Sequence, residues 1–142
     1  MGTRRATSIV LTVLAYVLAT FAVQAVSHFA INAEHYRSIP IMRAQPIFFL
    51  GVLSMLIQGT VFGFLFPIFD RGPSRIRSGL LFSWILGGFL ASYIVLAEPG
   101  KYEISSVASW VRVELVAAAA QFTLFGLLLS LVHGRTPTSG RS

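Results

Sequence analysis

The chain has 142 residues, of which 55% are hydrophobic and 11% charged, and it contains no cysteine. Average globular domains are roughly 25% charged and 45–50% apolar, so a chain this short could not hide so much apolar surface in a soluble core. The composition excludes disulfide scaffolds, cysteine-ligated zinc domains, disordered tails and ordinary water-soluble enzymes. The formal net charge of +6 need not indicate nucleic-acid binding, because basic residues beside apolar spans usually record membrane orientation.

The first two apolar segments are each long enough to cross a bilayer, which takes about 20 residues. Residues 6–33 carry no charge, so we expect this helix to be tilted or to continue past the membrane. The second segment, residues 44–69, has Pro46 near its start and Pro67 near its end. Proline is tolerated in a first helical turn and is common where a helix ends, so both prolines are predicted to mark boundaries.

The last two segments have a similar character. Residues 78–97 are apolar and are followed by an acidic residue, a proline and a glycine at 98–100, which predict the end of a helix. The fourth segment has its apolar body at residues 115–132, but the serines just before residue 107 can cap a helix earlier. We therefore expect the fourth helix at residues 107–133, with two polar turns at its start.

These segments predict an all-α membrane protein. No stretch alternates with the period of a β-strand over a useful length, and the segments are too long for barrel strands. The connections are short, so neighbouring spans should be antiparallel and form an up-down-up-down bundle of four transmembrane helices. The prediction is a single integral membrane domain over residues 1–142, with short polar tails at 1–5 and 134–142.

The charges are distributed unequally between the two ends of this bundle. The two tails and the second connection lie on one side and hold seven basic residues against a single acid, Asp70. These basic residues are Arg4, Arg5, Arg71, Arg75, Arg77, Arg135 and Arg141. The opposite side holds four basic residues and all four glutamates. The positive-inside rule therefore predicts a multi-pass protein of a bacterial-type inner membrane with both termini in the cytoplasm, and nucleic acid is not expected as a partner.

Residues 1–25 have a second interpretation as a secretory signal peptide, with two arginines, an apolar run and small residues at the end of that run. The run is about twice as long as the hydrophobic region of such a peptide. It also continues without a break through residues 28–33. We therefore expect an uncleaved first span.

The two halves of the chain share short sequence patterns. Residues 58–63 and 121–126 both read Gln-x-Thr-x-Phe-Gly, at an offset of 63 residues, and Ala-Glu recurs at 33–34 and 97–98, at an offset of 64. Two matches at nearly one offset predict a two-helix hairpin that is repeated once. Each copy has an even number of spans, so a pseudo-two-fold axis along the membrane normal would relate them.

The glutamines of this pattern, Gln58 and Gln121, are predicted to be polar groups inside the membrane. Amides in hydrocarbon need partners, and interhelical hydrogen bonds contribute about 0.6–2 kcal/mol each. Two interpretations are open: the glutamines hold the bundle together, or they line a path for a substrate. Small residues four positions apart, at 59 and 63 and at 126 and 130, further predict close helix contacts, within one chain or between copies.

The remaining polar side chains gather at the outer ends of the predicted spans. His28, Asn32 and His35 share one helical face of the first span. Glu114 is the most informative acid, because it begins the apolar body of the fourth span and a charge within the membrane usually faces a partner or a cavity. The candidate ligand-binding residues of this rim are His28, Asn32, His35, Tyr93, Glu98, Arg112 and Glu114. The structural alternative is a solvated rim with an aromatic belt and weak ion pairs.

Several chemistries lack their residues. Without cysteine there is no thiol nucleophile, iron–sulfur ligation or thioether haem attachment. The histidines have no recognised metal-ligand spacing, and the sequence contains no phosphate-binding glycine loop and no Gly-x-Ser-x-Gly motif. We therefore expect no metal, no cofactor and no catalytic residue of a known type.

Three functions fit these observations. The leading hypothesis is a small non-catalytic inner-membrane protein that is an accessory or assembly subunit, or that binds a lipid or small molecule at its periplasmic rim. The second is a small transporter built from duplicated hairpins, with Gln58 and Gln121 lining the path. The third is a membrane-embedded enzyme that uses Glu114, His28 and Glu98. A homo-oligomer or a larger membrane complex is compatible with each of them.

Overall fold

The computed structural model describes residues 2–43, 45–70 and 74–133, and this part of the chain consists of helices and their connections. The elements are α1 (Thr3–Val26), the π-helical turn η1 (Ser27–Ile31), α2 (Ala33–Arg37), α3 (Phe48–Phe69), α4 (Arg75–Ser92), the π-helical turn η2 (Tyr93–Ala97) and α5 (Val107–Val132). The all-helical prediction is therefore confirmed for these residues. The predicted tail at 134–142 and Arg71 lie outside the described residues.

Four helices in the described ranges are long and apolar enough to cross a membrane. They cover Arg5–Ile31, Phe48–Phe69, Arg75–Ala97 and Val107–Val132. The four apolar spans predicted from the sequence are therefore confirmed as helices, although their ends differ by a few residues.

Local backbone chemistry explains the differences at the helix ends. α3 begins at Phe48, later than predicted, because Pro46 disfavours a helical backbone in Gln45 and Ile47 adopts a non-helical backbone with ψ 84° as the N-cap residue. α4 begins earlier than predicted, at Arg75, because the Ser74 hydroxyl accepts a hydrogen bond from a backbone N–H of the first turn. Ser106 caps α5 in the same way, as the sequence predicts.

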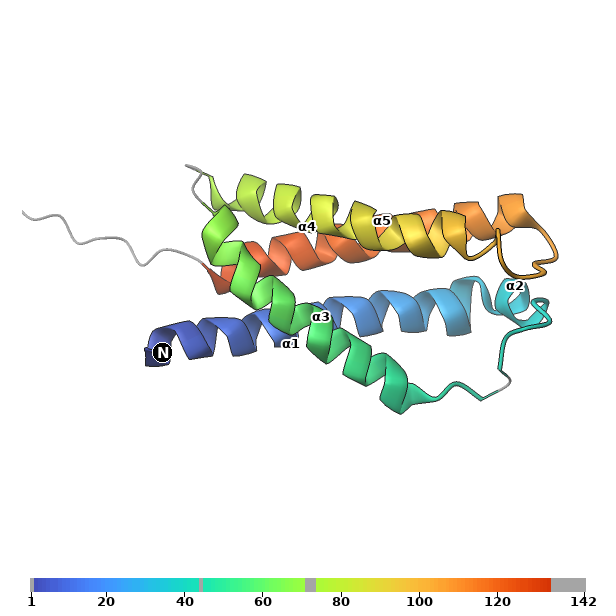
Figure 1. Cartoon of the computed structure of the whole chain (residues 1–142), viewed down its shortest axis with the longest axis horizontal. Helices are drawn as coiled ribbons and strands as arrows, with labels where there is room; N and C mark the ends of the chain where they lie inside the picture. Colours follow the sequence, from blue (N-terminus) through green and yellow to red (C-terminus); the bar gives the residue numbers. More distant parts are fainter. Residues whose placement is uncertain (1, 44, 71–73, 134–142) are drawn as a thin grey trace, which may run out of the picture.

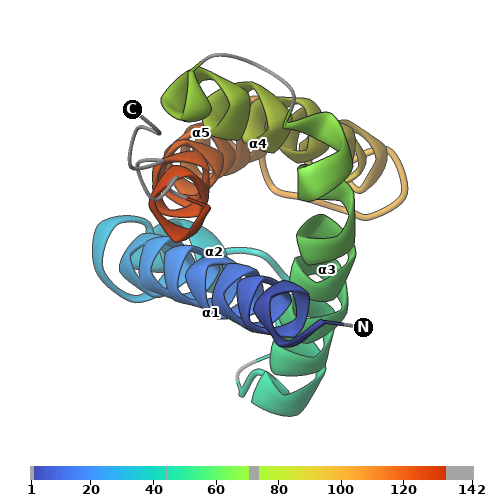
Figure 2. The same ribbon diagram turned by 90° about the vertical axis from the view of Figure 1, so that its left-hand side faces the viewer.

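The long helices contact one another in the order α3–α1–α5–α4. α5 packs along both α1 and α4, and α1 packs on α3, but α3 and α4 meet at few points. Viewed along the long axis, the four helices surround a common centre, and α3 crosses α1 at a steep angle (Figure 2). The N-terminal half of α3 diverges from the other helices (Figure 1). The two halves of the chain therefore pack unequally, and the duplication stays a prediction.

Glycines allow the closest helix contacts. A Cβ atom added to Gly126 of α5 would lie 2.9 Å from the Leu80 Cα atom of α4. A Cβ atom added to Gly87 of α4 would collide with the ring of Phe122. On the other side of the bundle, a Cβ atom on Gly59 would lie 3.1 Å from the backbone of α1. The pairs of small residues that begin at positions 59 and 126 therefore make helix contacts within the chain.

Two clusters of buried side chains lie at different levels of the bundle. Tyr16 packs edge-on against Phe62 and Phe125, with ring centroids 4.9 Å and 5.0 Å apart. We call the cluster around Tyr16 the aromatic core: Ala15, Tyr16, Ala19, Phe62, Phe66, Phe82, Phe122, Phe125 and Leu129. The second, the α2 cluster, contains Tyr36, Ile39, Trp110 and Val113. The bundle is thus held at its middle and at the end that carries α2.

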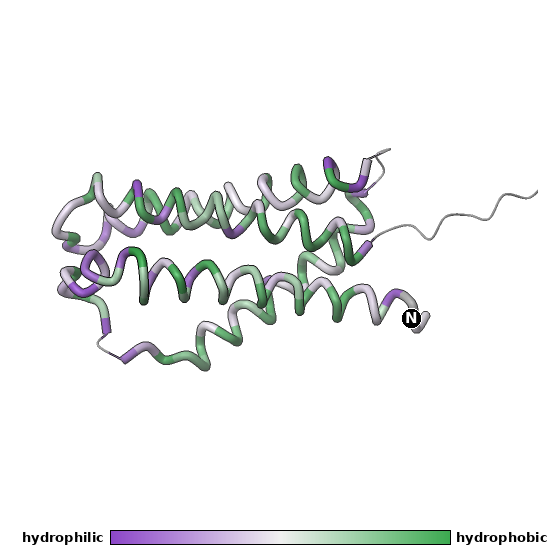
Figure 3. The backbone as a smooth tube through the Cα atoms, turned by 180° about the vertical axis from the view of Figure 1, so that it is seen from behind, coloured by the Kyte–Doolittle hydropathy of each residue, from purple (hydrophilic) through white to green (hydrophobic). Residues whose placement is uncertain are grey.

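Polar contacts also join α1 to α5 at the end opposite α2. The imidazole of His133 lies 3.1 Å from the Ser8 hydroxyl and 2.9 Å from the Thr12 hydroxyl. Arg75 and Asp70 form an ion pair of 3.6 Å at the same end. Figure 3 shows hydrophilic positions concentrated toward both ends of the helices, with longer hydrophobic stretches between them.

Gly126→Ala should destabilise the contact between α4 and α5, because the added methyl group would meet backbone atoms that cannot rotate away. Overpacking of this kind costs about 1–3 kcal/mol, which would lower the midpoint of unfolding in detergent. Gly88→Ala is the matched control, since an added Cβ atom there has nothing within 4 Å. The control should leave the midpoint unchanged or raise it slightly, and equal midpoints for the two variants would contradict the close approach.

The stability of the bundle should fall as the pH drops below about 6.5, the ordinary pKa of histidine. Burial lowers the pKa of His133, and the charge of Arg75 lowers it further, so the unfolded chain binds this proton first. The contribution of His133 to the free energy of unfolding is complete above the ordinary pKa of histidine. It is lost as the pH falls towards the lower pKa that His133 has in the folded chain. Thermal unfolding in detergent at about pH 7.5 and about pH 5.5 measures the change, which should be smaller in His133→Gln.

Candidate functional site

A cavity of about 510 Å³ lies among α1, α3, α4 and α5. Tyr16 and Phe122 of the aromatic core bound it on one side, and Trp110 of the α2 cluster bounds it on the other. Its wall is predominantly apolar, with a small number of polar side chains. The polar groups are Tyr16, Thr20, Gln24, His28, Ser54, Gln58, Glu98, Glu114 and Gln121.

Open space adjoins the cavity between α3 and α4. A second hollow, which shares Gln58, Leu90 and Ile94 with the cavity, lies between these two helices. Exposed apolar side chains flank the gap, among them Phe48 of α3 and Phe89 of α4. The opening exists because α3 diverges from α4 and leaves one side of the ring of helices without close contacts.

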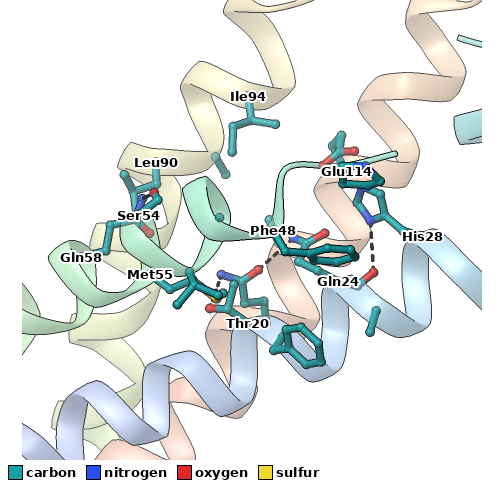
Figure 4. A pocket seen from close by; sticks show the side chains of 18 of the residues that line it. Thr20, Gln24, His28, Phe48, Ser54, Met55, Gln58, Leu90, Ile94 and Glu114 are labelled. Atoms are coloured by element: carbon teal, nitrogen blue, oxygen red, sulfur yellow. Dashed lines mark hydrogen bonds between the residues drawn. The ribbon is translucent and has the colours of Figure 1, made fainter. Parts of the chain in front are cut away.

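A buried carboxylate marks one end of the cavity. Glu114 of α5 is 8% exposed, and its Oε1 accepts a hydrogen bond of 2.7 Å from the Tyr36 hydroxyl. His28 stacks on the Tyr36 ring, with centroids 3.6 Å apart and planes 10° from parallel. Figure 4 shows His28 beside Glu114 at this end of the cavity, with Ser54 and Gln58 at the other.

The two π-helical turns lie at this same end and direct side chains to the cavity. In η1 the backbone N–H of Asn32 bonds to the carbonyl of Ser27, and in η2 that of Glu98 bonds to Tyr93. Each bond spans five residues, so the turn is wider than in an α-helix and the residues after it change direction. Turns of this kind occur often at functional sites. Here they precede α2, which carries Tyr36, and Glu98, which lines the cavity.

The two glutamines that are predicted to lie inside the membrane line the cavity, and both bond to α1 rather than to each other. Gln121 donates to the Thr20 hydroxyl at 3.1 Å and accepts from the Gln24 amide at 3.0 Å. The carbonyl of Gln58 accepts a 2.5 Å hydrogen bond from the Tyr16 hydroxyl. These bonds fit the interpretation that the glutamines hold the helices together, and they also fix polar groups in the cavity wall.

The partners of the glutamines on α1 belong to a pattern that our sequence interpretation missed. Every fourth residue from 8 to 36 is polar or carries a hydroxyl group. This α1 polar stripe consists of Ser8, Thr12, Tyr16, Thr20, Gln24, His28, Asn32 and Tyr36. Residues four apart share a helix face, with a drift of about 40° per step. A search at this spacing would have placed Tyr16, Thr20 and Gln24 beside His28.

The structure brings together only part of the predicted rim. His28, Glu98 and Glu114 line the cavity, whereas Asn32, His35 and Arg112 do not. Asn32 donates to the Ser27 hydroxyl, and His35 lies 3.2 Å from the Ser109 hydroxyl of α5. The π-helical turn η1 contains His28 and ends before His35, and both imidazoles contact the Tyr36 ring, with centroids 3.6 Å and 5.3 Å away. Two predicted candidates lie on the surface of the described chain: Tyr93 and Arg112.

The electrostatics of the rim favour a cationic or neutral guest. Burial raises the pKa of Glu98, and the negative charge of Glu114 raises it further. Burial also raises the pKa of the Tyr36 phenol, which therefore stays protonated and donates to Glu114. No lysine or arginine of the described residues lines the cavity. Within the same residues, no group of three or more histidine and acidic side chains could hold a metal ion.

Comparison with protein-family models, with curated proteins and with solved structures found no match to this chain. Its function is therefore inferred from the chemistry of the cavity, because function depends on the site and not on the fold.

Tyr36→Phe should destabilise the chain by removing the hydroxyl that donates to the buried Glu114 carboxylate. Hydrogen bonds to charged groups contribute about 1.5–3 kcal/mol, so the midpoint of unfolding in detergent should fall. Tyr102→Phe is the matched control, because Tyr102 is exposed and lies outside the cavity lining. A Tyr36→Phe midpoint equal to that of the control would show that this hydrogen bond is unimportant for stability.

Proposed function

We propose that this chain is a multi-pass protein of a bacterial-type inner membrane that binds an amphiphilic molecule from the bilayer in the cavity between its helices. The four apolar helices cross the membrane as an up-down-up-down bundle with both termini in the cytoplasm. The distribution of charge supports this orientation, because Arg75 and Arg77 lie in the first turn of α4, whereas Glu98 follows η2 at the other end and Glu114 lies in the first third of α5. Positive charge is enriched on the cytoplasmic side of such proteins.

One observation carries the proposed binding role: the cavity is apolar along most of its wall and ends at the buried carboxylate of Glu114. An amphiphile has the same division, with an apolar chain and a polar headgroup. Ligand cavities typically measure about 300–1,000 Å³ and combine apolar walls with a few polar groups. The cavity volume of about 510 Å³ lies within this range.

The gap between α3 and α4 provides the route for such a molecule. Both helices are apolar enough to span the membrane, so the gap opens to lipid chains rather than to water. The exposed side chains of Phe48, Phe89 and Ile94 flank it. A hydrocarbon chain can therefore pass from the bilayer into the cavity without crossing an aqueous phase.

Transport is the second candidate, and the position of the two glutamines favours it. Gln58 and Gln121 both line the cavity, as the transporter hypothesis requires. The aromatic core fills the bundle beyond the cavity, however, with Tyr16 1% exposed and Phe125 1% exposed. A transporter would have to open this core, whereas a binding protein needs only the cavity as it stands.

Trp110 can report directly on the contents of the cavity. It is 5% exposed and lines the cavity, whereas the second tryptophan, Trp84, is 50% exposed and lies outside the lining. We expect Trp110 to be quenched when a Trp84→Phe chain is reconstituted into phosphatidylcholine vesicles with brominated acyl chains, because bromine quenches indole at close range. Equal fluorescence in brominated and unbrominated vesicles would contradict the proposal.

A pair of glycine variants separates lipid in the cavity from lipid around the bundle. Gly51 lines the cavity, and an added Cβ atom there meets nothing within 4 Å. Gly51→Phe in the Trp84→Phe chain should therefore fill the cavity and relieve the quenching of Trp110. Gly88→Phe has equally open surroundings outside the cavity and should leave the quenching unchanged. Equal quenching in both variants would assign it to surrounding lipid and overturn the proposal.

A further inference from the structure

We infer that the molecule held in this cavity carries an ammonium group that pairs with Glu114, an inference that rests on the proposed binding function. Glu114 is more than nine-tenths buried, at 8% exposure, and it lines the cavity. Its Oε1 accepts the hydrogen bond from Tyr36, while its Oε2 accepts none from the described residues. A buried carboxylate without a compensating charge is costly, because a single hydrogen bond replaces only part of its hydration.

The lysines and arginines of the described part of the chain do not supply the compensating charge. No lysine or arginine of these residues lines the cavity. Their one ion pair joins Asp70 to Arg75, where α3 ends and α4 begins, at the opposite end of the helices. Arg112 is exposed on α5, and Lys101 lies on the surface, where its ammonium group donates to the Tyr93 hydroxyl at 3.0 Å.

The groups around Glu114 accept hydrogen bonds or attract cations. His28 Nδ1 lies 3.1 Å from the backbone carbonyl oxygen of Gln24. Since a carbonyl can only accept, Nδ1 carries a proton, and in the neutral form of the ring Nε2 is then an acceptor. Glu98 adds a second carboxylate to the cavity wall, and Trp110 adds an aromatic ring, whose face attracts cations.

Among cationic groups, an alkylammonium fits this end of the cavity best. A guanidinium group prefers both oxygens of a carboxylate, and the Tyr36 hydroxyl competes with it for Oε1 of Glu114, whereas an ammonium group needs only Oε2. A metal ion needs several ligands, and the described residues offer no group of three ligating side chains. An anionic headgroup would face Glu98 and Glu114 with no basic residue of the described chain in the lining, so it would be repelled.

Three single-chain amphiphiles of one chain length test the inference: dodecylamine, dodecanol and dodecylphosphonic acid. At neutral pH their headgroups are positive, neutral and negative. Each is added to the Trp84→Phe chain in brominated vesicles, and recovery of Trp110 fluorescence measures displacement of the brominated lipid. Dodecylamine should reach half-recovery at a mole fraction about tenfold lower than dodecanol, equivalent to 1.4 kcal/mol. Dodecylphosphonic acid should be the weakest of the three.

Two glutamate variants assign the preference to Glu114. Glu114→Gln keeps an oxygen that can accept from Tyr36 but removes the charge, so dodecylamine and dodecanol should then displace equally well. Glu103→Gln is the matched control, because Glu103 is exposed and lies outside the cavity lining, and it should keep the preference for the amine. A preference that survives Glu114→Gln unchanged would overturn the inference.

The outcomes distinguish failure of the ammonium inference from failure of the proposed function. If all three amphiphiles displace the brominated lipid at similar mole fractions and Gly51→Phe still relieves the quenching, the cavity binds amphiphiles but does not select an ammonium group. If Trp110 is not quenched by brominated lipid in the first place, the cavity does not take up lipid chains and the proposed function fails. Because the comparison of headgroups uses the chain without any change at Glu114, it stands even if Glu114→Gln does not fold.

Discussion

Polar groups inside an apolar span must find partners within the protein, and this constraint organises the whole bundle. An unpaired amide or hydroxyl in hydrocarbon costs free energy that no surrounding solvent can offset. The α1 polar stripe places such groups at every fourth position along the first helix. Most of them bond to α5, through His133 at one end, Gln121 in the middle and Glu114 at the other. The stripe therefore sets the rotation of α1 and holds it against α5 over its full length.

α3 diverges because its buried residues all lie in its C-terminal half: Gly59, Phe62, Gly63 and Phe66. Glycines bring α4 close to α5 on one side and α3 close to α1 on the other, but the direct contact between α3 and α4 is slight. α3 is anchored where Gly59 and Gly63 meet α1 and where Gln58 meets Tyr16. The first turns of α3, from Phe48 onward, lie before these contacts and diverge from the rest of the bundle. The cavity is the space left between those turns and the α4–α5 pair.

Much of this architecture was predictable from the sequence, because the hydrophobic length of each span is a local property. The sequence also predicts that Gln58 and Gln121 are intramembrane polar groups and that His28, Glu98 and Glu114 lie at one end. The cavity was not predictable, since its volume depends on the angle at which α3 crosses α1. That angle follows from side-chain contacts between residues far apart in the sequence. The π-helical turns leave no simple periodic signal either.

For the proposed amphiphile, the space between α3 and α4 has a consequence for how tightly the cavity needs to hold its guest. A compound that enters from the bilayer is encountered at its concentration in lipid, which for a hydrophobic molecule far exceeds its concentration in water. Partitioning thus supplies much of the apparent affinity, and occupancy follows membrane loading rather than dissolved concentration. The choice between different headgroups then depends on the few polar groups at the end of the cavity that carries Glu114. A weak but discriminating contact at Glu114 is sufficient for such a protein, and it leaves the guest free to return to the membrane quickly.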